Sequence, residues 1–107
     1  MTYDAGLVAR IADLLPAAEI RHARQKNVFG GRGFLLGKST FVIAWGDGLL
    51  VKTPPADYAA SLARPGVTPF APDGEHPMGT WVLVPLDLIA DDPDLIEWLS
   101  LAARSIR

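Results

Sequence analysis

The amino-acid sequence predicts an α+β fold, in which an antiparallel sheet of about five strands carries helices packed on one face. The chain has 107 residues, of which 50% are hydrophobic and 21% charged, as is typical of one globular domain. Helical repeats of apolar residues lie near both ends of the chain, whereas short apolar runs separated by glycine turns fill its middle. We therefore expect a single domain over 1–107 with the order helix, strands, helix, strands, helix.

The first helix is expected near the start of the chain, where Thr2 or Asp4 can cap its N-terminus. Apolar residues then recur at helical spacing on one side, at Leu7, Val8, Ile11, Leu14 and Leu15. Pro16 ends this helix, because proline cannot donate a hydrogen bond to the preceding turn.

A meander of strands is predicted next. Residues 20–28 form the first extended segment, although neither of its faces is purely apolar. The glycine-rich run from Gly30 to Gly33 predicts a tight turn or a bulge. The following strands are expected at 34–36, 39–45 and 49–53, joined by turns at Gly37-Lys38 and Gly46-Asp47-Gly48.

The second half of the chain predicts two more helices around one main strand. Pro54-Pro55 starts a short helix, and the proline-rich residues 67–77 predict a loop with at most an edge strand near Phe70. A strand over 81–84 is ended by Pro85. The last helix starts at Asp92-Pro93, a capping acid followed by proline, and it carries an apolar stripe at Leu95, Leu99, Ala102 and Ile106.

The strand over 39–45 is apolar on both faces. Phe41, Ile43 and Trp45 lie on one side, while Val42 and Ala44 lie on the other. An antiparallel sheet with one wet face would alternate apolar and polar residues. A second layer must therefore cover the other face. We expect either a second copy of the chain in a homodimer, which we prefer, or the loop 67–80 folded over the sheet.

Nothing in the sequence predicts an enzyme. The chain has no cysteine, which excludes disulfides, thiol nucleophiles and cysteine-based metal sites. His22 and His76 lie far apart in the sequence without partners at metal-ligand spacing, and His76 is expected to form a solvent-exposed group with Asp73 and Glu75. We expect no catalytic residue, no metal and no cofactor. The absence of a long apolar run and of a basic start predicts a cytoplasmic protein that does not bind membranes.

Charge is distributed unevenly along the chain. No acid occurs between Glu19 and Asp47, so this segment carries +5 and leaves −7 on the rest, for a net charge of −2. Its bases are Arg21, Arg24, Lys26, Arg32 and Lys38. They form a candidate site for anions or for weak nucleic-acid binding. The alternatives are a solvated surface or a contact between subunits, and strand alternation already separates Arg21 from Arg24 and Lys26.

Residues 26–34 read Lys-Asn-Val-Phe-Gly-Gly-Arg-Gly-Phe, and this Phe-Gly-Gly turn resembles the N-terminal domain of the TfoX/Sxy proteins, which are linked to the regulation of natural competence. The resemblance covers nearly the whole chain. It extends to Tyr3-Asp4, Gly46-Asp47-Gly48-Leu49 with Lys52, Gly66-Val67-Thr68-Pro69-Phe70, Met78-Gly79-Thr80-Trp81-Val82 and the helix from Asp91-Asp92 to Trp98. Two features differ: Val28 stands where the family usually has methionine, and the chain ends at Arg107, before the helical C-terminal domain of full-length regulators.

The resemblance implies an α+β fold of the secretion-chaperone-like type, self-association and a regulatory setting. We read the motif as mainly structural, with Phe29 anchoring a strand end in the core and the glycines permitting close approach of the backbone. The motif residues are Phe29, Gly30, Gly31, Gly33 and Trp81. We therefore expect a non-enzymatic interaction module that binds a protein partner or a second copy of itself, with weak nucleic-acid binding through residues 21–38 as the alternative.

Overall fold

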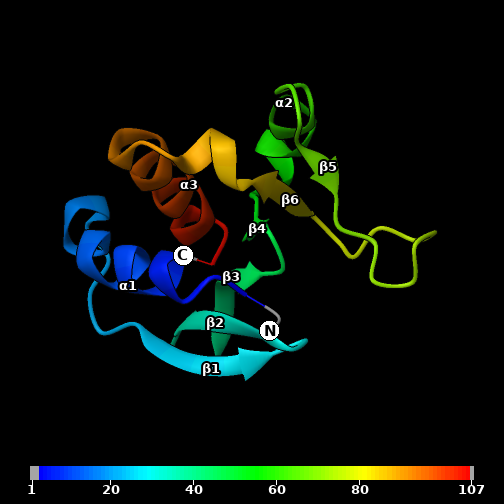
Figure 1. The fold of residues 1–107 in the computed structure, drawn as a ribbon. Helices are drawn as coiled ribbons and strands as arrows, with labels where there is room; N and C mark the ends of the chain where they lie inside the picture. The colour runs from blue at the N-terminus through cyan, green and yellow to red at the C-terminus, as the bar shows by residue number, and fades with distance from the viewer. Residues whose placement is uncertain (1–2, 107) are drawn as a thin grey trace.

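The fold is an antiparallel sheet with helices on one face (Figure 1). The computed structural model describes residues 3–106. The helices are α1 (Ala5–Leu14), α2 (Tyr58–Leu62) and α3 (Asp92–Arg104), with 3-10 turns at Pro16–Ala18, Pro55–Asp57 and Leu86–Ile89. The strands are β1 (Arg24–Val28), β2 (Gly31–Leu36), β3 (Ser39–Trp45), β4 (Gly48–Lys52), β5 (Thr68–Pro69) and β6 (Trp81–Pro85). The predicted α+β class and element order are confirmed.

The sheet has six strands in the order β1-β2-β3-β4-β6-β5, against the expected five or so. The first four strands form the predicted meander, and β6 then pairs with β4. The additional strand is β5, which pairs with β6 through Thr68 and Pro69 just before Phe70. The two edges of the sheet are therefore β1 and the very short β5.

Helix α1 begins where the sequence predicts. The carboxylate of Asp4 accepts hydrogen bonds from the amides of Gly6 and Leu7, at 2.8 and 3.2 Å, and so caps the N-terminus. Thr2, the other candidate cap, lies outside the described residues. Leu7 and Ile11 are buried against the sheet layer.

Helix α3 differs slightly from the prediction at its start. Asp91 rather than Asp92 is the N-cap residue, and its side chain makes no capping hydrogen bond. The backbone of Asp91 instead accepts from the amides of Asp94 and Leu95. Of the predicted stripe, Leu95, Leu99 and Ala102 are buried, and Ile106 is partly buried against the same core. Helices α1 and α3 thereby cover one face of the sheet (Figure 1). None of the helices within residues 3–106 combines the length and the apolar character needed to cross a membrane.

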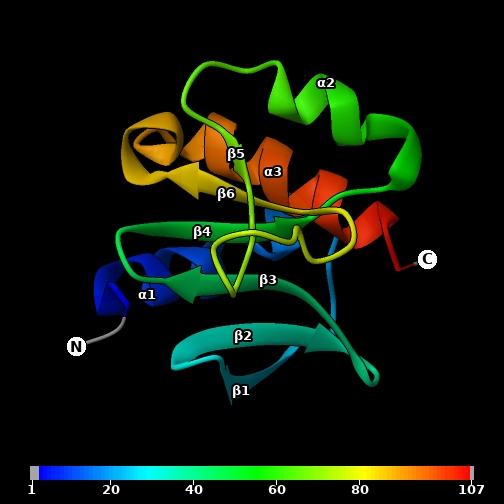
Figure 2. The same ribbon diagram turned by 90° about the vertical axis from the view of Figure 1, so that its right-hand side faces the viewer.

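The second face of the sheet is covered by the chain's own loop. Phe70 is buried in a small cluster with Ile43, Leu50 and Trp81, on the face opposite α1 and α3. Figure 2 shows β5 and the loop after it running in front of β6, β4 and β3, with α1 and α3 behind the sheet. Of the two covers that the sequence predicts, the loop is thus observed, and the homodimer stays a prediction.

The glycine-rich segment is the clearest departure from the sequence prediction. The turn consists of Phe29 and Gly30 alone, both with positive φ (53° and 79°), and Gly31 already begins β2. A Cβ at Gly31 would collide with the backbone oxygen of Ala44, and one at Gly33 would lie 2.9 Å from a methyl of Val28. These two glycines lie inside a strand because the neighbouring strands leave no room for a side chain.

Candidate interaction surface

Three aromatic residues meet on the second face of the sheet. Phe29 comes from the β1–β2 turn, Trp45 from the end of β3, and Phe70 from the segment after β5. The ring centroid of Phe70 lies 6.1 Å from that of Phe29 and 5.4 Å from that of Trp45, with interplanar angles of 59° and 69°. Such tilted and edge-on arrangements are favourable for aromatic pairs. We call these three residues the aromatic cluster.

Phe29 is not a core residue. Its exposed fraction is 56%, and it is the one large hydrophobic residue exposed among the residues that the structure describes. The prediction that Phe29 anchors a strand end in the core is therefore wrong. The two-residue turn places its side chain at the tip of the hairpin, and Phe70 and Trp45 already occupy the neighbouring sheet surface. The Phe29 ring contacts this surface and remains half in solvent.

Hydrogen bonding fixes the turn on this face. The indole Nε1 of Trp45 donates to the backbone carbonyl of Phe29 at 3.2 Å. The amide of Phe70 donates to the carbonyl of Trp81 at 3.0 Å, and the carbonyl of Phe70 accepts from the amide of Met78 at 2.8 Å. Trp81 itself is buried. The aromatic cluster is therefore held from both the turn and the loop.

A hollow of about 380 Å³ lies beside Trp45. Its lining residues are Trp45, Gly46, Asp47, Gly48, Gly66, Leu83 and Pro85. Three of the lining residues are glycines, and Gly48 lies so close to β6 that a Cβ there would come within 2.6 Å of the backbone oxygen of Val84. The hollow has apolar walls at Trp45, Leu83 and Pro85, with Asp47 as its charged member. It has the size and character to receive one apolar side chain.

The five predicted bases do not share one face. In the β1–β2 register, Arg24 and Lys26 lie on the face of the aromatic cluster, whereas Arg32 lies on the helix side, paired with Asn27. The Arg32 guanidinium donates to the side chains of Gln25 and Asn27, at 3.0 Å each.

The other two bases, Arg21 and Lys38, lie outside the strands, the first before β1 and the second in the turn between β2 and β3. Arg24 donates to the carbonyl of Gly37 at 2.7 Å, which brings its guanidinium beside the turn that carries Lys38. Arg21 precedes β1 and is exposed. The structure thus gathers Arg24, Lys26 and Lys38 at one corner of the sheet and turns Arg32 away.

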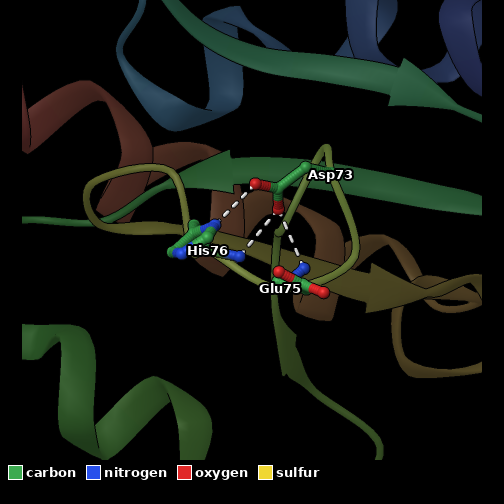
Figure 3. A network of polar contacts seen from close by, with 3 residues as sticks. All are labelled: Asp73, Glu75 and His76. Carbon is green, nitrogen blue, oxygen red and sulfur yellow. Dashed lines mark hydrogen bonds and ion pairs between the residues drawn. The ribbon is translucent and has the colours of Figure 1, made fainter.

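The predicted polar group in the loop is present and solvent-exposed (Figure 3). One oxygen of Asp73 accepts from the amides of His76 and Glu75, at 2.7 and 2.8 Å, and the other lies 2.7 Å from Nδ1 of His76. The backbone amide of His76, then that of Glu75, and then the His76 side chain lower the pKa of Asp73 to about 2. These contacts close the loop on itself, and residues 3–106 hold no group of three acidic or histidine side chains suited to a metal ion.

Sequence reasoning missed the aromatic cluster and the hollow beside it. The two-sided apolar pattern of 39–45 indicated that a second face needed cover. It did not indicate that Trp45 and Phe70 would meet Phe29, because residues 29, 45 and 70 come together only through the sheet register and the return of the loop.

Comparison with known proteins places this architecture in a family. The family model of the TfoX N-terminal domain, which describes the sequences of that family, matches residues 16–106 of this chain, which include all six strands and α3. No curated protein and no solved structure matches the chain. Since the family match spans most of the chain, this protein belongs to the TfoX N-terminal domain family.

Proposed function

We propose that this protein is a non-enzymatic interaction module that binds a protein partner through the aromatic cluster. One observation carries the proposal: Phe29 is both 56% exposed and held at a φ of 53°. A left-handed backbone costs a non-glycine residue roughly 1–2 kcal/mol, and two-residue hairpin turns favour asparagine or aspartate before glycine. A large aromatic residue that is neither buried nor suited to its backbone is typical of a functional position.

The surroundings of Phe29 suit a protein partner. Trp and other aromatic side chains supply much of the binding energy at protein interfaces, where they border small pockets. The Phe29 ring stands at the end of the aromatic cluster, and the hollow beside Trp45 lies next along the same face. A partner that inserts one apolar side chain into the hollow would cover the exposed ring. Membership of the TfoX N-terminal domain family supports a regulatory setting for this binding.

Selection of peptides tests the proposal without a known partner. Phage-displayed random peptides are selected on the wild-type protein, and the enriched sequences are titrated against wild type, Phe29→Asn and Ala12→Ser. Ala12 is exposed on α1, in the helix layer on the other side of the sheet, so its substitution is the control. We expect peptides with an apolar core whose affinity falls at least tenfold on Phe29→Asn only. A selection without enriched peptides, or peptides whose affinity is unchanged by Phe29→Asn, would refute the proposal.

A second copy of the chain is the other candidate partner for the aromatic cluster. It would form the homodimer that the sequence analysis prefers. Sedimentation velocity at rising concentration distinguishes it. Dimers that dissociate on Phe29→Asn identify self-association as the interaction. A monomer at every concentration assigns the cluster to a different protein.

Weak DNA binding is the second candidate function, favoured by the corner that gathers Arg24, Lys26 and Lys38. If these three bases contact phosphates, the plot of log affinity against log salt has a slope of about −3. Fluorescence anisotropy of labelled duplex and single-stranded DNA at two salt concentrations measures this slope. Absence of binding at low salt, or binding unchanged by combined charge reversal of the three bases, would exclude the DNA function.

A further inference from the structure

Strand β1 is the open edge of the sheet. It stands last in the strand order, and four of its five residues are exposed. The opposite edge, β5, has two residues, one of which is Pro69 and has no N–H to offer. Of the two edges, β1 is therefore the one that offers a row of backbone N–H and C=O groups with which an additional strand can pair.

The backbone groups that point outward from β1 follow from the hairpin. The two-residue turn pairs Val28 with Gly31, and the pair that flanks such a turn exchanges hydrogen bonds. Alternation along the ladder then leaves the N–H and C=O groups of Gln25 and Asn27 pointing away from β2. The side chains of these two residues are held by Arg32 on the helix side, so the outward backbone groups stand on an ordered strand.

The other face of β1 carries positive charge. Arg24 and Lys26 alternate there with Val28, and the exposed ring of Phe29 follows. Ion pairs join Arg10 with Asp92, Arg64 with Glu97 and Asp73 with His76. Neither Arg24 nor Lys26 takes part in these pairs. These two bases give this face of the edge its positive charge.

In the registers centred on Lys26 and on Gln25, this charge pattern disfavours a second copy of the chain at the edge. Antiparallel pairing of two β1 strands centred on Lys26 places the two Lys26 residues opposite each other. Pairing centred on Gln25 places Arg24 opposite Lys26 of the second copy. Like charges directly opposite across strands are destabilising, whereas opposite charges are stabilising. The same edge is complementary to an acidic strand.

We propose that the edge of β1 binds an extended acidic segment of a partner protein as an added strand. The ladder would use the outward backbone groups of Gln25 and Asn27, and acids at alternate positions of the segment would lie beside Arg24 and Lys26. The next position on the same face would place an apolar side chain beside Val28 and Phe29. This inference rests on the proposed function as an interaction module and names the chemistry of the partner.

A designed peptide tests the edge directly. The probe is a fluorescent peptide with the core Leu-Thr-Glu-Thr-Glu, whose leucine and glutamates alternate to face Val28, Lys26 and Arg24 in an antiparallel added strand. The reversed core serves for a parallel strand. One control replaces both glutamates by lysine. A second control carries N-methyl groups on the amides that face β1, which are those of the threonines in the antiparallel peptide and those of the second glutamate and the leucine in the reversed one. This removes the ladder hydrogen bonds that the peptide donates and keeps the charge.

We expect the acidic peptide to bind wild-type protein in one of the two directions and to shift the amide resonances of Gln25 and Asn27. Lys26→Glu weakens binding roughly tenfold, because attraction becomes repulsion across the strands. Arg104→Glu is the matched control, since Arg104 is an exposed base on α3 in the other layer. The lysine peptide and the N-methylated peptide are expected not to bind.

The possible failures are distinguishable. If neither direction of the acidic peptide binds, or if the N-methylated peptide binds equally well, strand addition at β1 is wrong. Peptides selected through Phe29 would still bind in that case, because the aromatic cluster does not require the ladder. If peptide selection also yields nothing that depends on Phe29, the interaction module itself is refuted.

Discussion

The indole Nε1 of Trp45 donates a hydrogen bond to the backbone carbonyl of Phe29 across 3.2 Å, and so ties the end of β3 to the turn between β1 and β2. Phe70, which follows β5 at the opposite end of the strand order, packs against both rings. Because the hydrogen bond uses the carbonyl and not the ring of Phe29, any residue in this turn could accept it. The bond therefore explains the position of the turn and does not explain the choice of phenylalanine, whose ring contacts Phe70 and is 56% exposed.

Trp45→Phe removes this hydrogen bond and retains an aromatic ring beside Phe70. We expect a loss of about 1 kcal/mol in the free energy of unfolding, the usual net contribution of one hydrogen bond. Hydrogen exchange at Gly30 and Gly31 should become faster, because the turn loses its tie to β3. Urea unfolding and amide exchange measure both effects. Unchanged exchange in the turn would show that Trp45 does not hold it.

Gly31→Ala tests the close approach between β2 and β3. The new methyl would collide with the backbone oxygen of Ala44, which cannot move as a flexible side chain can. We expect a loss of about 2 kcal/mol or more in the free energy of unfolding. Gly37→Ala is the control, because its φ of 61° causes strain but nothing lies within 4 Å; it should cost about 1 kcal/mol. A smaller loss at Gly31 than at Gly37 would contradict the register at this point.

Phe70→Ala separates the loop from the sheet. Phe70 is buried against Ile43, Leu50 and Trp81, so its truncation should lower the free energy of unfolding by about 3 kcal/mol. Hydrogen exchange in the segment 71–80 should rise more than exchange in α1, which packs on the opposite face. Thermal unfolding and exchange mass spectrometry provide the measurements. Equal exchange increases in both regions would indicate that the loop is not a separate cover.

The loop's polar contacts predict a pH dependence. Asp73 has its pKa lowered to about 2 by the amides of His76 and Glu75 and by the His76 side chain. A depressed pKa means that the carboxylate supports the loop fully above the unfolded value of 3.8 and loses this effect as pH falls through about 2. The amide resonances of Glu75 and His76 should therefore titrate with a midpoint near pH 2. A midpoint near pH 4 would show that these hydrogen bonds do not form.

Local chemistry made much of the fold predictable. Asp4 and Pro16 predict the two ends of α1, and the apolar stripe predicts the buried face of α3, because capping, proline and helical periodicity act over a few residues. The glycine-rich segment misled because glycine serves both turns and close strand packing. Gly31 and Gly33 serve the second purpose, which depends on Ala44 and Val28 across the sheet.

The candidate site was less predictable for the same reason. The basic segment was visible in the sequence, but strand alternation and the β1–β2 register turn Arg32 away from Arg24 and Lys26. The aromatic cluster depends on a contact between residues 29 and 70, which no local pattern encodes. The exposure of Phe29 could be known only once Trp45 and Phe70 were seen to fill the surface beneath it.

We propose that Phe29 serves binding and not folding, and Phe29→Asn tests this claim most directly through stability and affinity measured on the same protein. Asparagine relieves the strain of the left-handed backbone and loses the ring contact with Phe70, two effects of about 1 kcal/mol each with opposite sign. We predict a free energy of unfolding within about 1 kcal/mol of wild type, together with at least tenfold weaker binding of the selected peptides. A loss of about 3 kcal/mol or more, as for a core phenylalanine, with peptide affinity unchanged would contradict the claim.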